Sequence, residues 1–452
     1  MPFVPVVGFW STATSISMDE LQAAPGSGRH PRVVALVEDV PALEAALGVQ
    51  GIQGLTMPEI EEAVRSGALG ILRITEVSKR FHALEIDGVS LFGNDRVTDI
   101  AAWPLRATVS STENWDQSAT WTLVAAGDVM MDRGVAFELR NHPEGGDYLF
   151  DGGTARITGI RCCSFFGFDY PTTERTGNRG LVRELFQGAD IAVANLESAV
   201  LHDAPYHAQG FTFTADAKLL DAVDAAGFDY MSLANNHVRN AGERGILTAI
   251  EELNNRGIAN SGVGLGDDAS DPGFVETPTG ITVAIISCDA IRPGWEAVAG
   301  RVGTFNCKRS DIPGSIQRAK EQGADVVIVF PHWCCEYKLK PPTYAPDLAQ
   351  QWFDAGADMV TGAHSHIAGA IGDIDGKVVF YSMGNLIFDQ DFRQSTMMGV
   401  IPEMTFSGSE LVQIELHPTL IIDAQPNLIA PEDGGQFVLD QMRLGSEGLL
   451  DY

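Results

Sequence analysis

The sequence predicts a layered α/β fold with a smaller α/β domain at its N-terminus. Short apolar runs typical of buried strands recur after residue 121, and amphipathic segments with helical spacing separate several of them. A chain of 452 residues has room for two or three domains. In such layered folds ligand-binding residues gather at the carboxyl ends of the strands, so a site is expected there.

The first domain is expected over residues 1–116. Apolar runs and helical patterns alternate there: VVALV at 33–37, PALEAALG at 41–48, MPEIEEAVRSG at 57–67 and HALEIDGV at 82–89. The polar stretch ATVSSTENWDQSAT, which comes soon after Trp103-Pro104, has the composition of an inter-domain linker. A boundary near residue 116 therefore separates an accessory α/β domain from the rest of the chain.

The second domain is expected over residues 117–452. Its strands are predicted by the runs WTLVAAGDV, DIAVANLES, DYMSLANNH, ITVAIISCDA, DVVIVFPHW, DMVTGAHSH and KVVFYSMGN. Segments 215–228 and 242–257 have apolar residues at helical spacing and close at glycine, as helices do. Segment 135–185 interrupts this alternation, so it is predicted to be an insertion or a rim of the site.

Composition excludes several classes of partner. Sixty acidic against thirty basic residues leave a formal charge of −30, which repels nucleic acids and anionic membranes. No segment approaches the roughly 20 apolar residues of a membrane-spanning helix. The apolar N-terminus lacks the basic leader of a signal peptide. Nothing in the sequence indicates an oligomeric state.

Cysteine usage favours a cytoplasmic location. The six cysteines are two adjacent pairs, Cys162-Cys163 and Cys334-Cys335, together with Cys288 and Cys307. This number is small for a fold held together by disulfides, and adjacent cysteines rarely bond to each other. Most are therefore interpreted as reduced packing residues. Secretion after removal of a leader is the alternative.

Metal-competent side chains follow five of the predicted strands. They are Asp128, Glu197, Asn236 with His237, His332, and His364 with His366. A turn after DMVTGA would let both imidazoles of His364-Ser365-His366 face one site, although this motif alone is as often a chance pair. Carboxylate, amide and imidazole ligands together suit manganese, zinc or iron. The set therefore predicts a site for one or two divalent ions, and the other six of the ten histidines are predicted not to be ligands.

Six ordered motifs within residues 121–390 resemble those of the CapA family, which is named for poly-γ-glutamate capsule biosynthesis. They are GDVMMDRG at 127–134, Asn195-Leu196-Glu197, LANNH at 233–237, His332-Trp333 with Glu336-Tyr337, GAHSH at 362–366 and YSMGN at 381–385. The family is similar to the calcineurin-like metallophosphoesterases, so the resemblance implies a metallophosphoesterase-like α/β sandwich with a dinuclear metal site. The first domain resembles the truncated periplasmic-binding-protein-like module that precedes some CapA-type domains, and a plain α/β accessory domain explains it equally well.

The resemblance also implies a role for each motif residue. Asp128 would bind one ion and Glu197 would bridge both, and the remaining ligands would be Asn236, His332, His364 and His366. His237 would act as the general acid, with Glu336 as the next candidate. An anionic substrate would be held by Arg133, Asn235 and Asn385.

The chain departs from the family pattern at three places. Met130 replaces the histidine of the superfamily's Asp-x-His motif, and a thioether is a poor ligand for a hard ion. One ion would therefore be weakly held or absent, unless Asp132 substitutes. Asn240 stands where the CapA pattern has aspartate. Cys334-Cys335 replaces small residues beside His332, and packing explains these cysteines better than metal binding.

These inferences favour a metal-dependent hydrolase, in which metal-activated water attacks a phosphoester or a peptide-like or γ-glutamyl amide. The alternative is a protein that binds or assembles the polymer during capsule synthesis without turnover, and the loss of the Asp-x-His histidine favours it. A chain with a charge of −30 would repel a long polyglutamate. A small anionic or peptide-like substrate is therefore expected.

Overall fold

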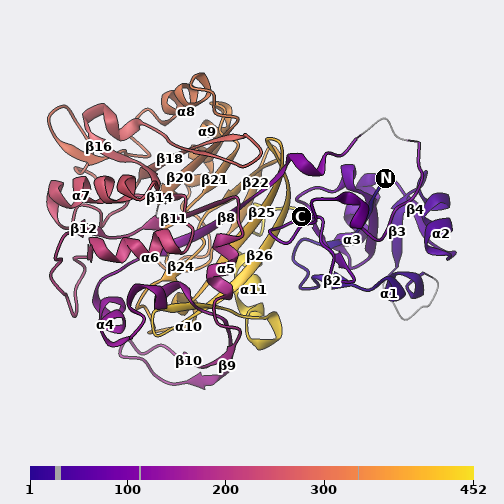
Figure 1. Cartoon of the computed structure of the whole chain (residues 1–452), viewed down its shortest axis with the longest axis horizontal. Helices are drawn as coiled ribbons and strands as arrows, with labels where there is room; N and C mark the ends of the chain where they lie inside the picture. Colours follow the sequence, from indigo (N-terminus) through magenta and orange to yellow (C-terminus); the bar gives the residue numbers. More distant parts are fainter. Residues whose placement is uncertain (26–31, 111–113, 334) are drawn as a thin grey trace. The chain divides into compact units, whose positions relative to one another are not determined.

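Two compact units make up the chain (Figure 1). The computed structural model describes residues 1–25, 32–110, 114–333 and 335–452, so His30 and Cys334 lie outside the described residues. The first unit contains Met1–Thr122, Glu403–Glu415 and Tyr452, and the second contains Leu123–Pro402 and Leu416–Asp451. Residues from late in the chain therefore belong to the first unit, for which the sequence suggested only residues 1–116.

The first unit is an α/β domain around one mixed sheet. The strand order is β4-β3-β5-β1-β6, with β3 parallel to β4 and β5, and β1 antiparallel to β5 and β6. Its elements are β1 Phe3–Gly8, β2 Ser15–Ile16, α1 Met18–Ala23, β3 Val33–Leu36, α2 Val40–Leu47, β4 Gln53–Leu55, α3 Met57–Arg65, β5 Leu69–Arg73, β6 Phe81–Ala83 and β7 Glu85–Ile86. A capping box of Thr56 and Glu59 starts α3. The predicted strands and helices of this region are present, although the run at 82–89 divides into β6 and β7.

The second unit is built on two sheets. The first has the order β10-β9-β27-β26-β25-β8-β11-β14-β15, with β24 beside β8. Its strands are β8 Thr120–Val129, β9 Thr154–Arg161, β10 Tyr170–Gly177, β11 Ile191–Leu196, β14 Tyr230–Ser232, β15 Ala259–Ser261, β24 Asn385–Ile387, β25 Met398–Ser407, β26 Glu410–Ile422 and β27 Gln425–Leu428. The second sheet has the order β17-β18-β20-β21-β23-β22. It consists of β17 Gly273–Glu276, β18 Thr282–Asp289, β20 Val326–His332, β21 Met359–Thr361, β22 Ile371–Ile374 and β23 Lys377–Phe380.

Helices pack on both sheets, and the sheets contact each other. On the first sheet, α5 Leu181–Gln187, α6 Leu220–Ala225 and α7 Gly242–Asn255 share an apolar core with β8 and β11. On the second, α8 Ile312–Glu321 and α9 Ala345–Asp354 share a core with β18 and β20. The Tyr230 hydroxyl on β14 lies 2.6 Å from the Ser287 hydroxyl on β18, which joins the sheets. Strands covered on both faces explain the continuous apolar runs, and the predicted layered α/β sandwich is confirmed.

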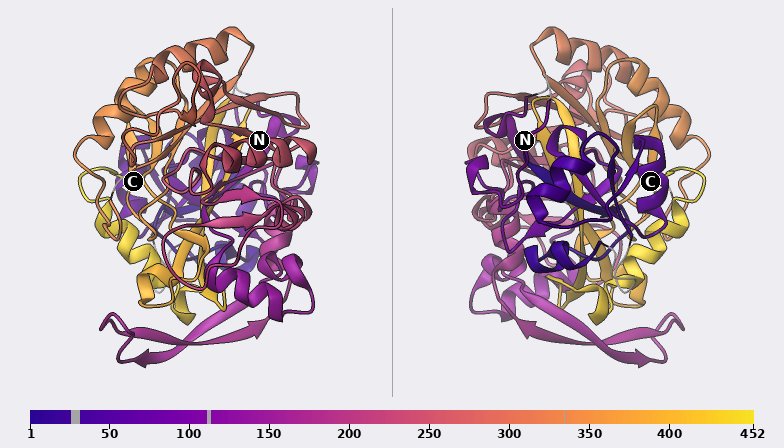
Figure 2. Two further views of the ribbon diagram at one scale, coloured as in Figure 1. Left: turned by 90° about the vertical axis from the view of Figure 1, so that its left-hand side faces the viewer. Right: turned by 90° about the vertical axis from the view of Figure 1, so that its right-hand side faces the viewer.

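A long hairpin lies in the region that interrupts the strand and helix alternation (Figures 1 and 2). It is formed by β9 and β10, which pair antiparallel and follow α4 Arg133–Asn141. Residues between the two strands include Phe165, Phe166 and Phe168, whose side chains are exposed. The hairpin tip therefore presents an apolar surface.

Two disulfides occur among the described residues, so the expectation of reduced cysteines is wrong. Cys288 near the end of β18 bonds to Cys307, and Cys162 bonds to Cys163. A parallel bridge between Asp289 and Asn306 brings the first pair together, and no local sequence pattern announces such a contact. The cysteines therefore no longer support a cytoplasmic location.

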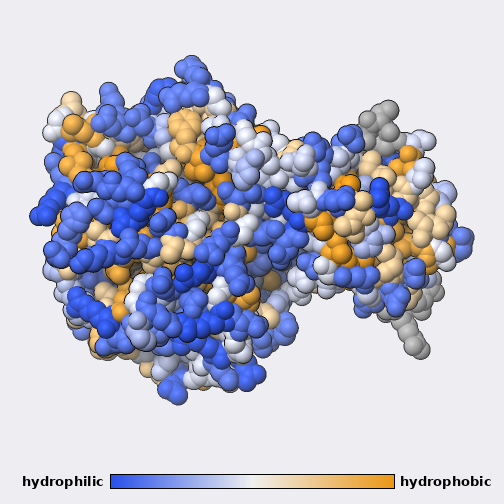
Figure 3. Space-filling model, viewed as in Figure 1, coloured by the Kyte–Doolittle hydropathy of each residue, from blue (hydrophilic) through white to orange (hydrophobic). Residues whose placement is uncertain are grey.

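The remaining α-helices and strands complete the second unit. They are β12 Ala199–Leu201, β13 Thr214–Asp216, β16 Val263–Leu265, β19 Val302–Thr304, α10 Gln394–Met397 and α11 Gln436–Gly445. Hydrophilic side chains cover much of the face in Figure 3, in keeping with the charge of −30. None of the helices in the described part of the chain has the length and apolarity that crossing a membrane requires.

Candidate metal centre

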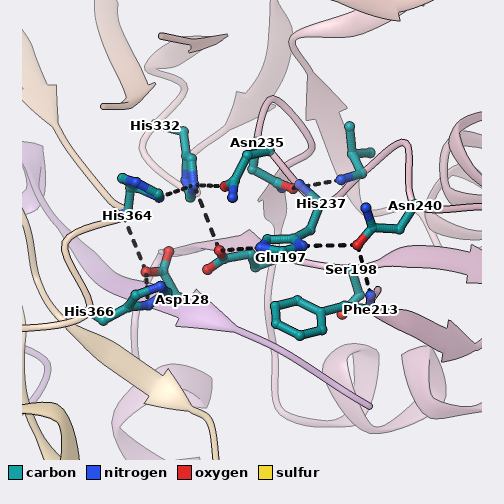
Figure 4. A network of polar contacts seen from close by, with 12 residues as sticks. Asp128, Glu197, Ser198, Phe213, Asn235, His237, Asn240, His332, His364 and His366 are labelled. Carbon is teal, nitrogen blue, oxygen red and sulfur yellow. Dashed lines mark hydrogen bonds and ion pairs between the residues drawn. The ribbon is translucent and has the colours of Figure 1, made fainter. Parts of the chain in front are cut away.

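Strand ends bring the predicted ligands of the two sheets together (Figure 4). On the first sheet, Asp128 and Glu197 lie at the ends of β8 and β11, which are parallel neighbours. On the second sheet, His332 ends β20, and a short turn with two histidines follows β21. All six predicted ligands are buried, namely Asp128, Glu197, Asn236, His332, His364 and His366.

The acidic and imidazole ligand atoms form two groups that share one carboxylate. Glu197, His332 and His364 form one group, and Asp128, Glu197 and His366 form the other. Within each group the ligand atoms lie within 4.8 Å of one another. A carboxylate that belongs to both groups has the position of a bridging ligand between two ions.

The backbone at the two histidines explains why both face the site. His364 has φ 95° and His366 has φ 59°, in the left-handed region that non-glycine residues rarely occupy. Such backbone is unfavourable unless the surroundings hold it, and it is concentrated at functional sites. The turn brings His364 Nδ1 to 3.0 Å from His332 Nε2 and His366 Nδ1 to 3.3 Å from Asp128 Oδ2.

Glu197 provides the test of whether a metal fits here. Both of its carboxylate oxygens are buried and have no hydrogen-bond partner. Burial, and then the negative charge of Asp128, raise the pKa of Glu197 well above its ordinary value. A buried carboxylate without donors is costly, and a divalent cation would remove that cost. The chemistry of this residue therefore fits a metal.

His332 and His364 are in the protonation state that metal ligands need. Burial lowers the pKa of His332 well below its ordinary value and that of His364 to about 3. Neighbouring imidazoles lower both pKa values further. Neutral imidazoles offer a lone pair to a cation, so these two histidines need release no proton to bind one at neutral pH.

Asparagine side chains orient several of these ligands. Asn236 Oδ1 lies 2.7 Å from His332 Nε2, which places this amide in the first group. Asn195 Nδ2 donates to Asp128 Oδ1 at 2.8 Å. Asn195 is not among the predicted site residues, although it lies in the Asn-Leu-Glu motif two residues before Glu197, which follows β11. In the structure it holds Asp128 in place.

Met130 and Asp132 do not join either group. Met130 is fully buried in the apolar core of the first sheet. Asp132 accepts from the backbone N–H groups of Arg133 and Thr214 and pairs with His207 Nδ1 at 2.6 Å. Since its oxygens already have these partners, Asp132 does not replace the missing histidine of the Asp-x-His motif.

His237 lies beside Glu197 and outside both groups. Its Nε2 is 3.8 Å from Glu197 Oε1, and its ring stacks on Phe213 with centroids 4.0 Å apart. Its Nδ1 lies 2.9 Å from Asn240 Oδ1, which fixes a tautomer with the proton on Nδ1. Burial lowers the pKa of His237 to about 4, so the imidazole is neutral at pH 7 and its Nε2 lone pair faces the site.

Two asparagines predicted to hold substrate are used within the protein. Asn235 is fully buried, accepts from the N–H groups of His237 and Val238, and donates to Asn195 Oδ1. Asn385 Oδ1 lies 2.9 Å from His366 Nδ1, and its Nδ2 donates to the Thr396 carbonyl. The structure therefore leaves neither amide free for a substrate, and Asn385 positions a ligand.

Arg133, predicted to hold substrate, and Glu336, the alternative candidate for the general acid, lie outside both ligand groups. The Arg133 guanidinium pairs with Asp389 and donates to the Gly210 carbonyl at 3.0 Å. An acidic partner within the protein therefore already offsets the charge of Arg133. Glu336 is exposed on the loop after β20 and belongs to neither ligand group.

Asp289 is a buried carboxyl group that the sequence analysis overlooked. It ends β18 and lies in register with His332 on the neighbouring parallel strand. Burial raises its pKa to about 6, while Oδ1 accepts from the N–H of Ile291 at 2.7 Å. The run ITVAIISCDA ends on this carboxyl group, as other strands end on the predicted ligands, so the same strand-end pattern marks it in the sequence.

Comparison with known proteins agrees with the motifs. Residues 122–390 match the family of bacterial capsule synthesis proteins described as PGA_cap. The chain is 26% identical over 338 residues to the capsule biosynthesis protein CapA of Bacillus anthracis, covering 72% of each chain. It is 27% identical over 245 residues to the PGA biosynthesis protein CapA of Bacillus subtilis, covering 52% of this chain and 64% of that protein.

A solved structure with a similar arrangement is a 5′-nucleotidase precursor from Thermus thermophilus. It is 14% identical, with a TM-score of 0.37, and the match covers 73% of this chain and 59% of that one. The chain thus spans about three fifths of the length of this nucleotidase.

Proposed function

The chain belongs to the family of bacterial capsule synthesis proteins, and from this membership we propose that it is a metal-dependent hydrolase. The bond that it cleaves is a phosphoester or a γ-glutamyl amide of a compound used in making a polyglutamate capsule. The observation that carries the proposal is Glu197, a buried carboxylate with two unpartnered oxygens that is shared by two groups of ligands. Paired divalent ions that share a carboxylate serve hydrolytic displacement in many enzymes.

The ligands divide between two ions. Glu197, His332 and His364 would hold one, with Asn236 beside them, and Asp128, Glu197 and His366 would hold the other. Divalent ions at these positions would lower the pKa of a water molecule and so supply a nucleophile at neutral pH. Manganese, zinc and iron all accept this donor set.

Several residues of the chain prepare the site for this reaction. Asn195 and Asn385 hold Asp128 and His366 by hydrogen bonds of 2.8 and 2.9 Å. His237 would deliver a proton to the leaving group from Nε2, while Asn240 keeps the other proton on Nδ1. Because the free imidazole is neutral at pH 7, Nε2 must take up a proton from solvent when an anionic substrate arrives beside it.

Full-length protein loaded separately with manganese, zinc and iron is expected to release phosphate from para-nitrophenyl phosphate or glutamate from tri-γ-glutamate. Chelation should abolish turnover, and metal should restore it. The measurement is product release over many turnovers, with metal content determined on the same samples. Metal-loaded protein that turns over neither compound would reject the hydrolase.

A protein that binds or assembles the polymer without turnover is the second candidate. Two residues of the site favour this candidate. Met130 packs in the apolar core at the position where the superfamily has a metal-binding histidine. Asn240 has a neutral side chain where the CapA pattern has a carboxylate. Metal-loaded protein that binds tri-γ-glutamate without cleaving it would support this candidate.

The Asn240→Asp variant is expected to be more active at neutral pH than the wild type. A carboxylate within hydrogen-bond distance of an imidazole raises its pKa by about 1–3 units, and burial sets the pKa of His237 at about 4 in the present site. Because the protonated form is lost as pH rises through this pKa, the variant should retain it to higher pH. The measurement is the pH dependence of kcat, whose alkaline limb should move upward by about one unit.

The opposite shift would contradict a proton-donating His237. If His237 instead accepts a proton, a higher pKa would depress activity on the acid side. Asp at this position can keep the hydrogen bond that Asn240 Oδ1 receives from Phe213 N–H at 2.7 Å, so the variant is expected to fold.

A further inference from the structure

An arginine without a carboxylate partner lies near the histidine side of the candidate metal centre. Arg393 Cζ is 4.8 Å from the centroid of the Tyr337 ring and 5.6 Å from that of Phe168. Its Nε is buried and has no hydrogen-bond partner, and no carboxylate in the described part of the chain forms an ion pair with it. The residue as a whole is half-buried.

Tyr337 connects this arginine to the ligands. The Tyr337 ring centroid is 6.0 Å from that of His366, and Tyr337 N–H donates to the Ser365 carbonyl at 2.8 Å. The tyrosine is therefore anchored to the turn that carries His364 and His366. One aromatic ring separates the free guanidinium from a proposed metal ligand.

The aromatic cluster beside Arg393 extends to the residue before it and to the hairpin. Phe392 lies 5.1 Å from Phe166 and 5.9 Å from Tyr337 between ring centroids. The Tyr337 and Phe168 rings beside the guanidinium reduce its access to water, and an ion pair is stronger where water is excluded. The surroundings strengthen binding of an anion without neutralising the charge.

The contrast with Arg133 shows what is unusual here. Arg133 also lies over aromatic rings, but Asp389 neutralises it. The chain has sixty acidic and thirty basic residues, so a partly buried arginine without an acid is not explained by a shortage of carboxylates. Burial lowers the pKa of Arg393 and no carboxylate counteracts it, as expected for a cation that lacks its counter-ion.

We propose that Arg393 binds a second anionic group of the substrate, a carboxylate or a phosphate, while the bond to be cleaved lies at the metal centre. This inference rests on the proposed function and adds the substrate class: a compound with an anionic group a short distance from the scissile bond. The aromatic rings of Tyr337 and Phe392 flank the connecting part of that compound. The positive charge of Arg393 would also offset, close to the site, the electrostatic repulsion between an anionic substrate and a chain of charge −30.

The first test is protection of Arg393 from phenylglyoxal, which modifies accessible guanidinium groups. Full-length metal-loaded protein is treated with and without tri-γ-glutamate or tripolyphosphate, and mass spectrometry gives the modification rate at each arginine. We expect protection of several-fold at Arg393 and none at Arg244, an exposed arginine on α7. Protection by the first probe assigns a carboxylate, and protection by the second assigns a phosphate.

The second test is calorimetric binding of whichever anion protects, or of both anions when Arg393 resists modification. Arg393→Met should weaken binding about tenfold or more, the usual effect of losing a charge-assisted hydrogen bond. The matched control, Arg244→Met, should bind as the wild type does. Equal affinities of wild type and Arg393→Met for both anions would overturn the proposal.

The two proposals fail in different ways. Binding that depends on Arg393 in protein that cleaves nothing would reject the hydrolase and retain the anion site. Hydrolysis that proceeds with unchanged KM in Arg393→Met, together with unchanged binding, would reject the anion site alone.

Discussion

Replacing Glu197 with glutamine is expected to reduce the metal content from two ions per chain to one or none. Glu197 is the residue common to both ligand groups, and a neutral amide cannot bridge two cations as a carboxylate does. Activity should fall on the order of a thousandfold, because bound ions supply several kcal/mol of transition-state stabilisation. Elemental analysis of protein reconstituted with manganese, zinc or iron gives the stoichiometry, and kcat is measured on the same samples.

A matched control and two histidine variants sharpen this result. Glu251→Gln removes the same charge from an exposed position on α7 and should keep both ions. His364 and His366 belong to different groups, so His364→Asn and His366→Asn should each lose one ion. Two ions in Glu197→Gln, or none in the wild type after reconstitution, would contradict a dinuclear centre.

The same glutamine substitution should stabilise the metal-free protein. Burial raises the folded-state pKa of Glu197, so its folded form holds a proton that the unfolded chain releases above about pH 4.5. The contribution of Glu197 to the free energy of unfolding is therefore fully present below that pH and is lost as the pH rises. The melting temperature of metal-free Glu197→Gln should exceed that of metal-free wild type, and by more at pH 8 than at pH 5.

The strand ends and the turn were open to prediction because they depend on local patterns. Each predicted ligand follows an apolar run, and runs of that kind become parallel strands whose ends meet at one edge. His364 and His366 were expected to converge through a turn, and their positive φ values provide it. Local sequence thus specified which side chains reach the site.

Residues predicted to hold substrate could not be judged locally, because distant partners decide their use. Arg133 is neutralised by Asp389, more than 250 residues later in the chain. Asn235 and Asn236 are adjacent in the sequence but have different partners. The side chain of Asn235 accepts from a backbone N–H group, whereas that of Asn236 lies beside His332. Arg393 could not be identified from the sequence for the same reason. It is unusual only in the folded chain, where no carboxylate pairs with its guanidinium.

Membership of the first unit and the Cys288–Cys307 disulfide depended on tertiary contacts in the same way. Residues 403–415 lie far from residues 1–122 in sequence, but Gln413 Nε2 donates to the Phe81 carbonyl at 2.9 Å. No change in composition marks the return of the chain to the first unit, because residues 403–415 belong to strands β25 and β26 and the turn between them. The first unit's N-terminal segment ends at Thr122, just beyond the linker expected at 107–120, whereas no such polar stretch accompanies its later segment Glu403–Glu415.

His237→Asn is expected to lower kcat by about a hundredfold or more while leaving the metal content unchanged. His237 Nε2 faces Glu197 from 3.8 Å but belongs to neither ligand group, so the substitution removes a proton donor and no ligand. KM should change little. His202→Asn, at an exposed histidine, is the control for both measurements. Loss of metal would place His237 among the ligands, whereas full activity would move the proton donor elsewhere, with Glu336 the next residue to replace.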